Sequence, residues 1–559
     1  MFRSLLPITI AGLAYLLQSL AHSTTSSAAS VPTGVPIDGD YSGPYRPRVH
    51  FSPPKGFMND PNGLHKDNNG TWHLYYQYNP TDIVAGNQHW GHATSPDLYH
   101  WTNQPIALFP PNASSGVFSG SAVIDTNNTS GFFPDQDNGV VAIYTLNTPT
   151  AQVQQIAYSK DGGYSFEEYE GNPVLDVGLT QFRDPKVIWY EDHWVMAVAF
   201  PVDYVIGVYT SPDLKSWRHA SNISHVGFLG LQYECPNLVS IPIANSSDSA
   251  WVLTISINPG SPLGGSITQY FPGEFNGTHF TPFDSAARLT NFGKDDYAGQ
   301  FFYDEPVSIG WASNWQYTNF VPTGEEGWRS AMTLPRKNYF TNITAAGWDL
   351  VQEVYDFSPV LGNQLDTQQL VNESSTVTFT EGAYIDVNFT IPEDASFAEY
   401  ASLNFTVCTD SSGETVKGGY FFADPYSIAA WLDRGDTKAF ESPFFTDKFS
   451  VAPVCPTALP MSFCFVFFNA NFFSFPSFPL NHFSPLFIHY AIQAHQAKRL
   501  QVIIDRSVVE IYIDNGALVG TMVAFPEEPF TKLEVTTAGL PDGIEVEFGV
   551  WDLKDSWTS

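Results

Sequence analysis

The sequence predicts an all-β protein with two domains, on three observations. Aromatic residues make up 15% of the chain, and it holds 42 Gly and 41 Pro, a composition typical of short strands joined by tight turns. Apolar residues alternate over short runs, and no long stretch has the 3.6-residue period of a helix. Finally, 559 residues are too many for one compact core, which predicts at least two domains.

The N-terminal region has the pattern of an exported protein. In residues 1–23, Arg3 precedes an apolar run that ends in small residues, as in a signal peptide. The alternative, a membrane anchor, is disfavoured because polar residues interrupt a run that is already short. Residues 24–47 are rich in Ser, Thr, Pro and Gly and predict a flexible lead-in. Eleven Asn-x-Ser/Thr sequons between Asn69 and Asn404 favour a glycosylated protein that is secreted or held in the cell wall.

Charge and cysteine content exclude several functions. The net charge is −33 and the isoelectric point is about 4.5, so the surface repels nucleic acid and anionic membranes and favours a neutral substrate. Four cysteines in 559 residues do not make a disulfide scaffold. Cys235, which follows Glu234, is predicted to be a buried small side chain and not a nucleophile.

Residues 48–340 contain short strands and a weak internal repeat. Residues 72–78 alternate apolar and polar side chains, as a half-buried strand does. Ser-Pro-Asp-Leu-x-x-Trp occurs at 95–101 and at 211–217, with a looser copy at 159–166. In each copy the Asp is placed to bond turn amides while an aromatic residue anchors the turn. Coincidental turns are the alternative, but the recurrence favours the blades of a β-propeller.

The remainder of the chain predicts a connector and a second β domain. Residues 341–373 look like a linker, and strand alternation returns across 374–559, which predicts a β-sandwich. Asp514-Asn515-Gly516 is a hairpin turn between apolar runs. Residues 454–495 do not fit this strand pattern, because they contain no Asp, Glu, Lys or Arg and Phe recurs in clusters. Our interpretation is an insertion, either translated intron sequence or a long apolar loop.

Three short islands carry acidic residues in neutral or aromatic settings. They are 50–63 with Asp60, 182–185 with Asp184, and 233–236 with Glu234, each beside a Pro where a strand is expected to give way to a turn. A purely structural turn Asp is the alternative for Asp60. For Glu234 the alternative is an ion pair with Arg183.

The setting of each acid nevertheless favours chemistry. The apolar neighbours of Glu234 disfavour a charge there, as a general acid requires. The Arg183–Asp184 doublet could be an internal ion pair or a clamp on substrate hydroxyls. Since two carboxylates near one bond are the usual means of breaking a glycosidic link, the islands predict a glycosidase.

These residues resemble the signature motifs of glycoside hydrolase family 32, especially its yeast-type secreted members. The three principal motifs are Asn59-Asp60-Pro61-Asn62-Gly63, Phe182-Arg183-Asp184-Pro185 and Glu234-Cys235-Pro236. Further matches are Tyr76-Gln77-Tyr78-Asn79-Pro80, Trp90-Gly91-His92, Phe118-Ser119-Gly120-Ser121 and Trp311-Ala312-Ser313-Asn314-Trp315. The resemblance runs from about residue 48 to the C-terminus, except for the Phe-rich segment.

The resemblance implies a five-bladed β-propeller followed by a β-sandwich, and a retaining enzyme that releases terminal β-fructofuranosyl units from sucrose or fructans. It implies Asp60 as nucleophile, Glu234 as acid/base and Asp184 as the residue that stabilises the transition state. The fructose pocket would be formed by Asn59, Gln77, Trp90, Phe118, Ser119, Arg183 and Trp315. Neither a metal nor an organic cofactor is expected, and His89, His92 and His100 are interpreted as structural or sugar-facing. A homo-oligomer through the β-sandwich stays open.

Three departures from the family pattern bear on the choice between hydrolysis and transfer. Phe57 stands where many members carry Trp, Asn237 follows the Glu-Cys-Pro triplet, and 323–328 replaces a shorter junction. The alternatives within the enzyme class are therefore a fructosyltransferase and an exo-inulinase. An inactive fructan-binding lectin is a remote alternative, because such a protein would be expected to lack one of the three carboxylates.

Overall fold

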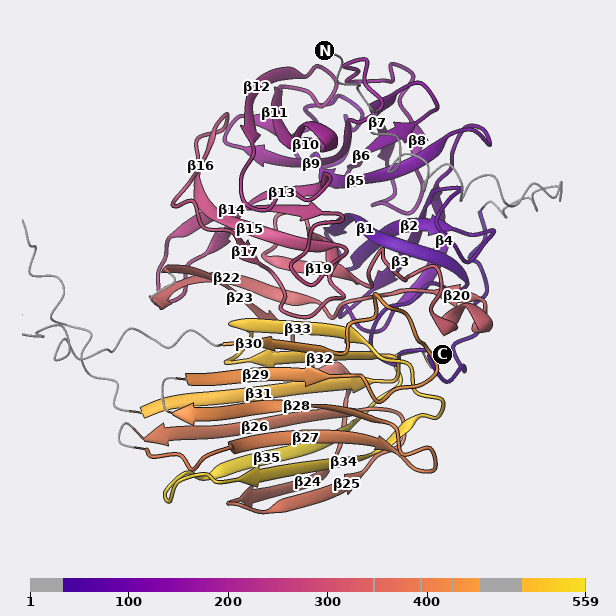
Figure 1. The fold of residues 1–559 in the computed structure, drawn as a ribbon. Helices are drawn as coiled ribbons and strands as arrows, with labels where there is room; N and C mark the ends of the chain where they lie inside the picture. Colours follow the sequence, from indigo (N-terminus) through magenta and orange to yellow (C-terminus); the bar gives the residue numbers. More distant parts are fainter. Residues whose placement is uncertain (1–33, 345–346, 393–394, 425–426, 453–494, 558–559) are drawn as a thin grey trace, which may run out of the picture.

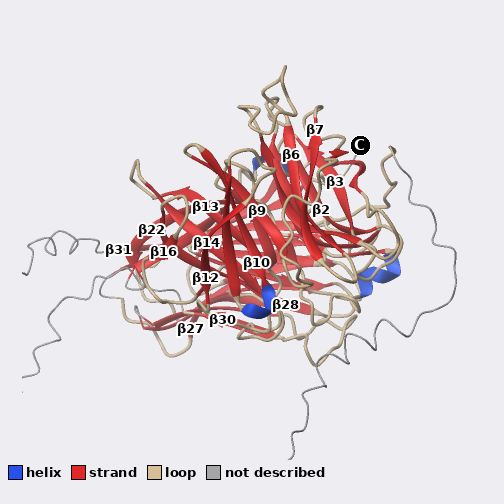
Figure 2. Ribbon diagram, turned by 90° about the horizontal axis from the view of Figure 1, so that it is seen from above, coloured by secondary structure: helices blue, strands red, loops and turns tan. Residues whose placement is uncertain are grey.

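A computed structural model describes residues 34–344, 347–392, 395–424, 427–452 and 495–557. Figure 1 shows two parts of the molecule. Small sheets, coloured indigo to pink, lie in the upper part, and larger sheets, coloured salmon to yellow, lie in the lower part. Figure 2 shows that strands dominate both parts and that helices are confined to short turns. The described helices are the 3-10 turns η1 (Pro201–Asp203), η2 (Pro322–Glu326) and η3 (Ser358–Val360). None of the described helices is long and apolar enough to cross a membrane.

Five small, mainly antiparallel sheets form the blades of a propeller, as expected. Blade 1 holds β1 (Gly56–Lys66), β2 (Trp72–Asn79), β3 (His89–Ser95), β4 (Thr102–Leu108) and, parallel to β1, β20 (Trp328–Arg329). Blade 2 holds β5 (Gly116–Ile124), β6 (Val140–Asn147), β7 (Gln152–Ser159) and β8 (Glu167–Glu168). Blade 3 holds β9 (Arg183–Tyr190), β10 (His193–Phe200), β11 (Val205–Ser211) and β12 (Arg218–Ser224).

Two further blades complete the ring. Blade 4 holds β13 (Tyr233–Pro242), β14 (Ser249–Ile257), β15 (Ile267–Phe275), β16 (Phe280–Pro282) and β17 (Arg288–Leu289). Blade 5 holds β18 (Tyr297–Phe301), β19 (Val307–Ala312), β21 (Ala331–Met332), β22 (Arg336–Thr344) and β23 (Gly347–Val354). The first strands β1, β5, β9, β13 and β18 contact one another in ring order, so they are the inner strands of the propeller.

Each inner strand is interrupted by a register shift near its start. The shifts fall between Met58 and Pro61 in β1, Val117 and Gly120 in β5, and Glu234 and Asn237 in β13. In β9 the shift lies in the stretch that carries Asp184, opposite Ala197 and Ala199 of β10, and in β18 it follows Tyr297. A bulge re-aims a side chain without ending the strand. The islands are therefore bulged strands, where the sequence indicated strand ends.

The C-terminal part is a sandwich of two six-stranded sheets. One has the order β24 (Leu361–Leu370), β35 (Val546–Leu553), β26 (Ala383–Pro392), β31 (His495–Asp505), β32 (Val508–Ile513), β33 (Leu518–Val523). The other has the order β25 (Ser374–Thr378), β34 (Phe530–Ala538), β27 (Ala401–Thr409), β28 (Thr415–Asp424), β29 (Ser427–Asp433), β30 (Lys448–Val451). Alternating inward side chains such as Leu403, Phe405 and Val502 form one buried core between the sheets.

Strands replace most of the expected connector at 341–373. The end of β22 and all of β23 belong to blade 5, and β24 already belongs to the sandwich. The alternation in this stretch is weak because β24 is an edge strand whose side chains are mostly exposed. The anomalous segment 454–495 lies, except for its last residue, outside the described residues. Its flanks β30 and β31 belong to different sheets of the sandwich.

The repeated Ser-x-Asp turns have the structure that the sequence predicts. Asp97 accepts hydrogen bonds from the backbone N–H groups of Tyr99 and His100. Asp161 and Asp213 accept equivalent backbone bonds in blades 2 and 3. Local bonds of this kind fix the turns between outer strands and leave the inner strands free to carry the site.

Buried ion pairs join the propeller to the sandwich. Arg336 at the start of β22 pairs with Asp296 through Nη1 and with Glu510 of the sandwich through Nη2, both at 2.7 Å. His50 Nδ1 lies 2.7 Å from Asp505 Oδ2 of the sandwich. Because charges buried in this way are stable only with their partners in place, the two parts have one fixed arrangement.

Candidate active site

Bulges in three inner strands bring the three predicted carboxylates together. Asp60 is on β1, Asp184 on β9 and Glu234 on β13. The Cys235 thiol lies 3.3 Å from Asp60 Oδ2 and 3.7 Å from Asp184 Oδ2. Arg183 lies 2.9 Å from Glu234 Oε1 and 4.0 Å from Asp184 Oδ2. Residues that are 174 positions apart in the sequence thus form one site.

Asp60 is held by three donors. Ser119 Oγ donates to its Oδ2 at 2.7 Å, Asn59 Nδ2 donates to its Oδ1 at 3.0 Å, and the Cys235 thiol also donates to Oδ2. Burial raises the pKa of Asp60, and the charge of Glu234 adds to that effect, while the three donors lower it. A carboxylate that is largely stripped of water but fixed by donors is well prepared to act as a nucleophile.

Asp184 adopts a backbone φ of 65°, a left-handed conformation that Asp and Asn adopt more readily than most other residues. Its Oδ2 accepts a hydrogen bond from the Cys235 backbone N–H at 3.0 Å. Burial raises the pKa of Asp184 to about 7; the charge of Arg183 lowers it, and the charges of Glu234 and Asp60 raise it. The shifted pKa indicates a functional position.

Glu234 has different partners on its two oxygens. Arg183 Nε and Nη2 donate to Oε1 at 3.2 and 2.9 Å, and the Tyr297 hydroxyl donates to Oε2. The Arg183–Glu234 ion pair, which the sequence left as the alternative to a catalytic role, is present. It does not exclude that role, because the guanidinium occupies only one of the two oxygens.

Arg183 is itself fixed by glutamines from its surroundings. Its Nη1 donates to Gln181 Oε1 at 2.6 Å and to Gln152 Oε1 at 3.3 Å, and its Nη2 donates to Gln232 Oε1 at 3.1 Å. The guanidinium therefore has a single orientation, and its planar fork can hold an oxygen-rich ligand in a defined geometry.

The other predicted binding residues make three kinds of contact. Asn59, Ser119 and Arg183 contact the carboxylates directly, as described above. Gln77 and Trp90 instead donate to the backbone carbonyls of Val117 and Phe118, at 3.0 and 3.1 Å. These two side chains therefore support the bulge of β5, which carries Phe118 and Ser119. Trp315 packs against Phe57 and Trp311, with ring centroids 6.1 and 4.8 Å away, and so belongs to an aromatic wall beside the site.

Sequence reasoning missed several residues that complete the site. Tyr297 and the three glutamines around Arg183 were not singled out. Cys235 is buried as predicted, but its thiol also joins Asp60 to Asp184, and burial raises its pKa well above the ordinary value, so it remains a thiol. Nothing in the sequence around Tyr297 indicates a site residue. Only the fold does, because Tyr297 lies at the bulge of blade 5 that corresponds to the bulges carrying the acids.

The three departures from the family pattern lie in different structural surroundings. Phe57 is 1% exposed and lies in the aromatic wall. Asn237 is buried, and its amide bonds the backbone of Gly299 and Phe301 in blade 5, so it joins two blades and does not select an acceptor. In the 323–328 segment, Glu326 accepts a bond from the Tyr45 backbone, which anchors the lead-in chain.

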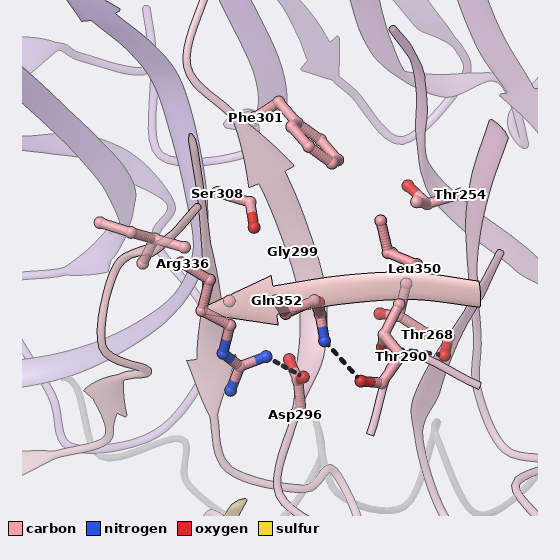
Figure 3. A pocket seen from close by; sticks show the side chains of 12 residues that line it. Thr254, Thr268, Thr290, Asp296, Gly299, Phe301, Ser308, Arg336, Leu350 and Gln352 are labelled. Atoms are coloured by element: carbon pink, nitrogen blue, oxygen red, sulfur yellow. Dashed lines mark hydrogen bonds and ion pairs between the residues drawn. The ribbon is translucent and has the colours of Figure 1, made fainter. Parts of the chain in front are cut away.

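A separate polar cavity lies between blades 4 and 5 and has no part in this site. Figure 3 shows Thr254, Ser308, Gln352 and the Arg336–Asp296 pair around it. None of the predicted site residues lines it. All of its lining residues belong to blades 4 and 5 or to the segment between them, and one of them, Arg336, also pairs with Glu510 of the sandwich.

Three carboxylates that meet in one site of a β-propeller are an arrangement suited to a hydrolase acting on glycosides. The sequence matches the glycosyl hydrolases family 32 N-terminal domain over residues 50–353 and the family 32 C-terminal domain over residues 360–552. The chain belongs to the glycosyl hydrolases of family 32, and the predicted resemblance is confirmed.

Similar proteins agree with that membership. Invertase 2 of Saccharomyces cerevisiae is 44% identical over 455 residues, which cover 73% of this chain and 81% of that protein. An extracellular exo-inulinase of Meyerozyma guilliermondii is 44% identical over 432 residues, covering 72% and 81%. The solved structure of fructofuranosidase from Schwanniomyces occidentalis complexed with fructose superposes with a TM-score of 0.79 at 36% identity, covering 93% of this chain and all of that one.

Proposed function

We propose that this hydrolase is a secreted, retaining β-fructofuranosidase that acts chiefly on sucrose. The observation that carries the proposal is the convergence of Asp60, Asp184 and Glu234 on three neighbouring inner strands. The names of the invertase, exo-inulinase and fructofuranosidase relatives support a fructosyl substrate. The signal-peptide pattern and the relative named as extracellular support secretion.

In the first step Asp60 attacks the anomeric C2 of the terminal fructofuranosyl unit. A bond forms between C2 and a carboxylate oxygen of Asp60 while the bond from C2 to the glycosidic oxygen breaks. Glu234 donates its proton to that oxygen, and glucose leaves when the substrate is sucrose. In the second step the ionised Glu234 takes a proton from water, which attacks C2 and releases fructose and the Asp60 carboxylate. Two displacements at one carbon retain the configuration.

Asp184 and Arg183 have a different role in this proposal. The backbone N–H of Cys235 holds the Asp184 carboxyl in place, and this carboxyl would bind ring hydroxyls. Such bonds stabilise the transition state when they strengthen as positive charge develops on the sugar ring. The fixed fork of Arg183 would orient both the sugar and Glu234.

The same site fits the terminal unit of a fructan, so exo-inulinase activity is the second candidate. The relative named exo-inulinase, as similar to this chain as Invertase 2 is, favours it. Fructosyl transfer differs only in the acceptor of the second step. Phe57 is the departure from the family pattern that could influence the choice of acceptor, since it lies in the aromatic wall beside the site.

Incubation of purified protein with dilute and concentrated sucrose, followed by sugar chromatography, tests the proposal. We expect equal amounts of glucose and fructose at the lower concentration. An excess of free glucose with kestose-type products would identify a transferase instead. Addition of methanol as acceptor tests the stereochemistry: methyl β-fructofuranoside, identified by NMR, indicates retention, and the α-anomer contradicts it. Secretion is tested by N-terminal sequencing of protein from the medium, which should begin near residue 24.

A further inference from the structure

Arg183 contacts only Oε1 of Glu234. Among the hydrogen bonds of the described residues, Tyr297 makes the one to the other oxygen, Oε2. It begins β18, the inner strand of blade 5, where the register shift to Gln300 turns its side chain toward blade 4. The residue is 1% exposed, and its ring packs edge-on against Trp311 at 6.3 Å. Its hydroxyl donates to Glu234 Oε2.

A Glu234 that acts as an acid carries its single proton on one of its two oxygens, and the partners of the oxygens decide which. Oε1 receives two bonds from Arg183, and a guanidinium only donates, so a proton on Oε1 would face N–H groups. Oε2 faces a hydroxyl, which can either donate or accept. The proton of Glu234 therefore belongs on Oε2, and the Tyr297 hydroxyl can adapt to its presence or absence.

Burial and the nearby negative charge of Glu234 raise the pKa of the Tyr297 phenol well above its usual range. The hydroxyl accordingly keeps its hydrogen throughout the working pH range and does not itself serve as an acid. It can donate to the ionised carboxylate when Glu234 acts as base, and it can accept from the protonated form.

We propose that Tyr297 is a positioning residue for Glu234: it keeps the proton on Oε2, aims that oxygen at the leaving group and stabilises the carboxylate that forms. The inference rests on the proposed function, because it assigns a partner to the proposed acid/base.

Two buried ion pairs fix the two residues that immediately precede Tyr297 in the chain. Asp295 Oδ2 pairs with Arg434 Nη1 of the sandwich at 2.7 Å, and Asp296 Oδ2 pairs with Arg336 Nη1 at 2.7 Å. All four side chains are at most 4% exposed. The sandwich therefore holds the backbone immediately before Tyr297, and through it the orientation of Glu234.

The test compares Tyr297→Phe with the wild type on two donors. Sucrose needs a protonated leaving group, whereas p-nitrophenyl β-D-fructofuranoside releases a phenolate that needs little protonation. We expect kcat/KM, which reports formation of the fructosyl-enzyme, to fall on sucrose by about 10–100-fold, the range for losing one hydrogen bond to a charged group. On the activated donor kcat/KM should change far less.

Controls separate this role from general structural damage. Tyr99→Phe removes another buried hydroxyl, which donates to the Tyr355 carbonyl remote from the site, and should leave the ratio of the two rates unchanged. That ratio is a property of the active molecules, so partial unfolding of Tyr297→Phe does not affect it. In a Glu234→Gln background, Tyr297→Phe should add less than about two-fold, since coupled residues are not additive.

Equal losses on both donors would overturn the assignment of Tyr297 and leave the proposed function intact. The proposed function has its own control: Asp60→Ala must be inactive on both donors. If that variant remains active, the nucleophile is wrong and the proposed function fails irrespective of Tyr297.

Discussion

Arg434 of the sandwich and Asp295 of the propeller form an ion pair in which neither side chain is exposed to solvent. The Nη1–Oδ2 distance is 2.7 Å, and the second carboxylate oxygen of Asp295 accepts a bond from the Tyr317 hydroxyl. The guanidinium also lies 3.5 Å from the centre of the Phe445 ring. Because these two charges come from different domains, each is compensated only while the domains are joined.

Loss of one partner in this pair should strongly destabilise the protein. Arg434→Met leaves the Asp295 carboxylate buried without its cation, and breaking a buried pair in this way costs about 3–5 kcal/mol. Urea unfolding monitored by fluorescence should show that loss in the free energy of unfolding. Lys417→Met, which removes a half-exposed pair with Asp436, is the matched control and should cost about 1 kcal/mol or less. Equal effects of the two variants would refute the interface role of Arg434.

Asp60→Ala should abolish hydrolysis while preserving the fold. The variant loses the group that forms the bond to C2, and removal of a nucleophile lowers kcat by roughly 10⁴-fold or more. Sucrose turnover measured by glucose release checks the rate, and circular dichroism with thermal unfolding checks the fold. Since removal of Asp60 also relieves the crowding of buried carboxylates, Asp60→Ala should unfold at a temperature no lower than the wild type. Near-normal cleavage by Asp60→Ala would show that another group is the nucleophile.

The general features of the fold and the three carboxylates could be predicted because their signals are local. Strand alternation, turn residues and the short motif around each acid all lie within about ten residues. The bonds that complete the site are not local. Asp295 and Asp296 look in the sequence like an ordinary acidic surface pair, and their significance depends on Arg434, which lies 139 residues away from Asp295. The bulge that turns Tyr297 toward Glu234 likewise depends on pairing with β19.

The connector was mispredicted for a related physical reason. Exposed edge strands such as β24 have too few buried side chains to show alternation. The expectation that Gln77 and Trp90 line the pocket stays a prediction, and the structure adds that their donors bond the backbone of β5. A motif identifies such residues as belonging to the site, but only the fold shows which contact they make.

Glu234→Gln should lose activity in a way that depends on the leaving group. The amide keeps the shape of the side chain and cannot supply a proton, so kcat on sucrose should fall by about 10²–10⁴-fold, the usual contribution of a general acid or base. With an activated aryl fructoside the first step needs no proton, and a burst of the phenol should precede slow turnover. Stopped-flow absorbance measures that burst. A uniform loss on both donors, without a burst, would be inconsistent with the acid/base assignment.

A stack of buried histidines in blade 1 should make the protein less stable in acid. The His65 and His73 ring centroids are 4.4 Å apart, those of His73 and His92 are 5.2 Å apart, and His73 Nδ1 lies 3.1 Å from His92 Nε2. Two carboxylates are near, Asp67 at 3.9 Å from His73 Nε2 and Asp161 on the side of His92. Burial nevertheless lowers the pKa of all three rings, that of His92 to about 3.

The sign of the effect follows from the unfolded chain, where a histidine has a pKa near 6.5. As the pH falls below about 6.5 the unfolded state takes up protons that the folded stack cannot, so stability decreases by about 1.4 kcal/mol per pH unit for each such histidine. Two other buried groups do not contribute to a decrease between pH 6.5 and 4.5. The pKa of Glu510 is lowered to about 2, so its contribution persists above pH 4.5. The pKa of His50 is raised to about 9, so its contribution is complete below pH 6.5.

Substitution of His73→Phe keeps an aromatic ring in the stack and removes one titrating group. The free energy of urea unfolding at pH 7.0, 5.5 and 4.5 should therefore decline less steeply for this variant than for the wild type, by about 1.4 kcal/mol per pH unit. His219→Phe, at an exposed position on β12, is the control and should retain the wild-type slope. If His73→Phe also retains that slope, the acid sensitivity arises outside the stack. The carboxylates around Asp184 are not its source, because a raised pKa makes the folded state take up protons first and so stabilises the protein as the pH falls toward 4.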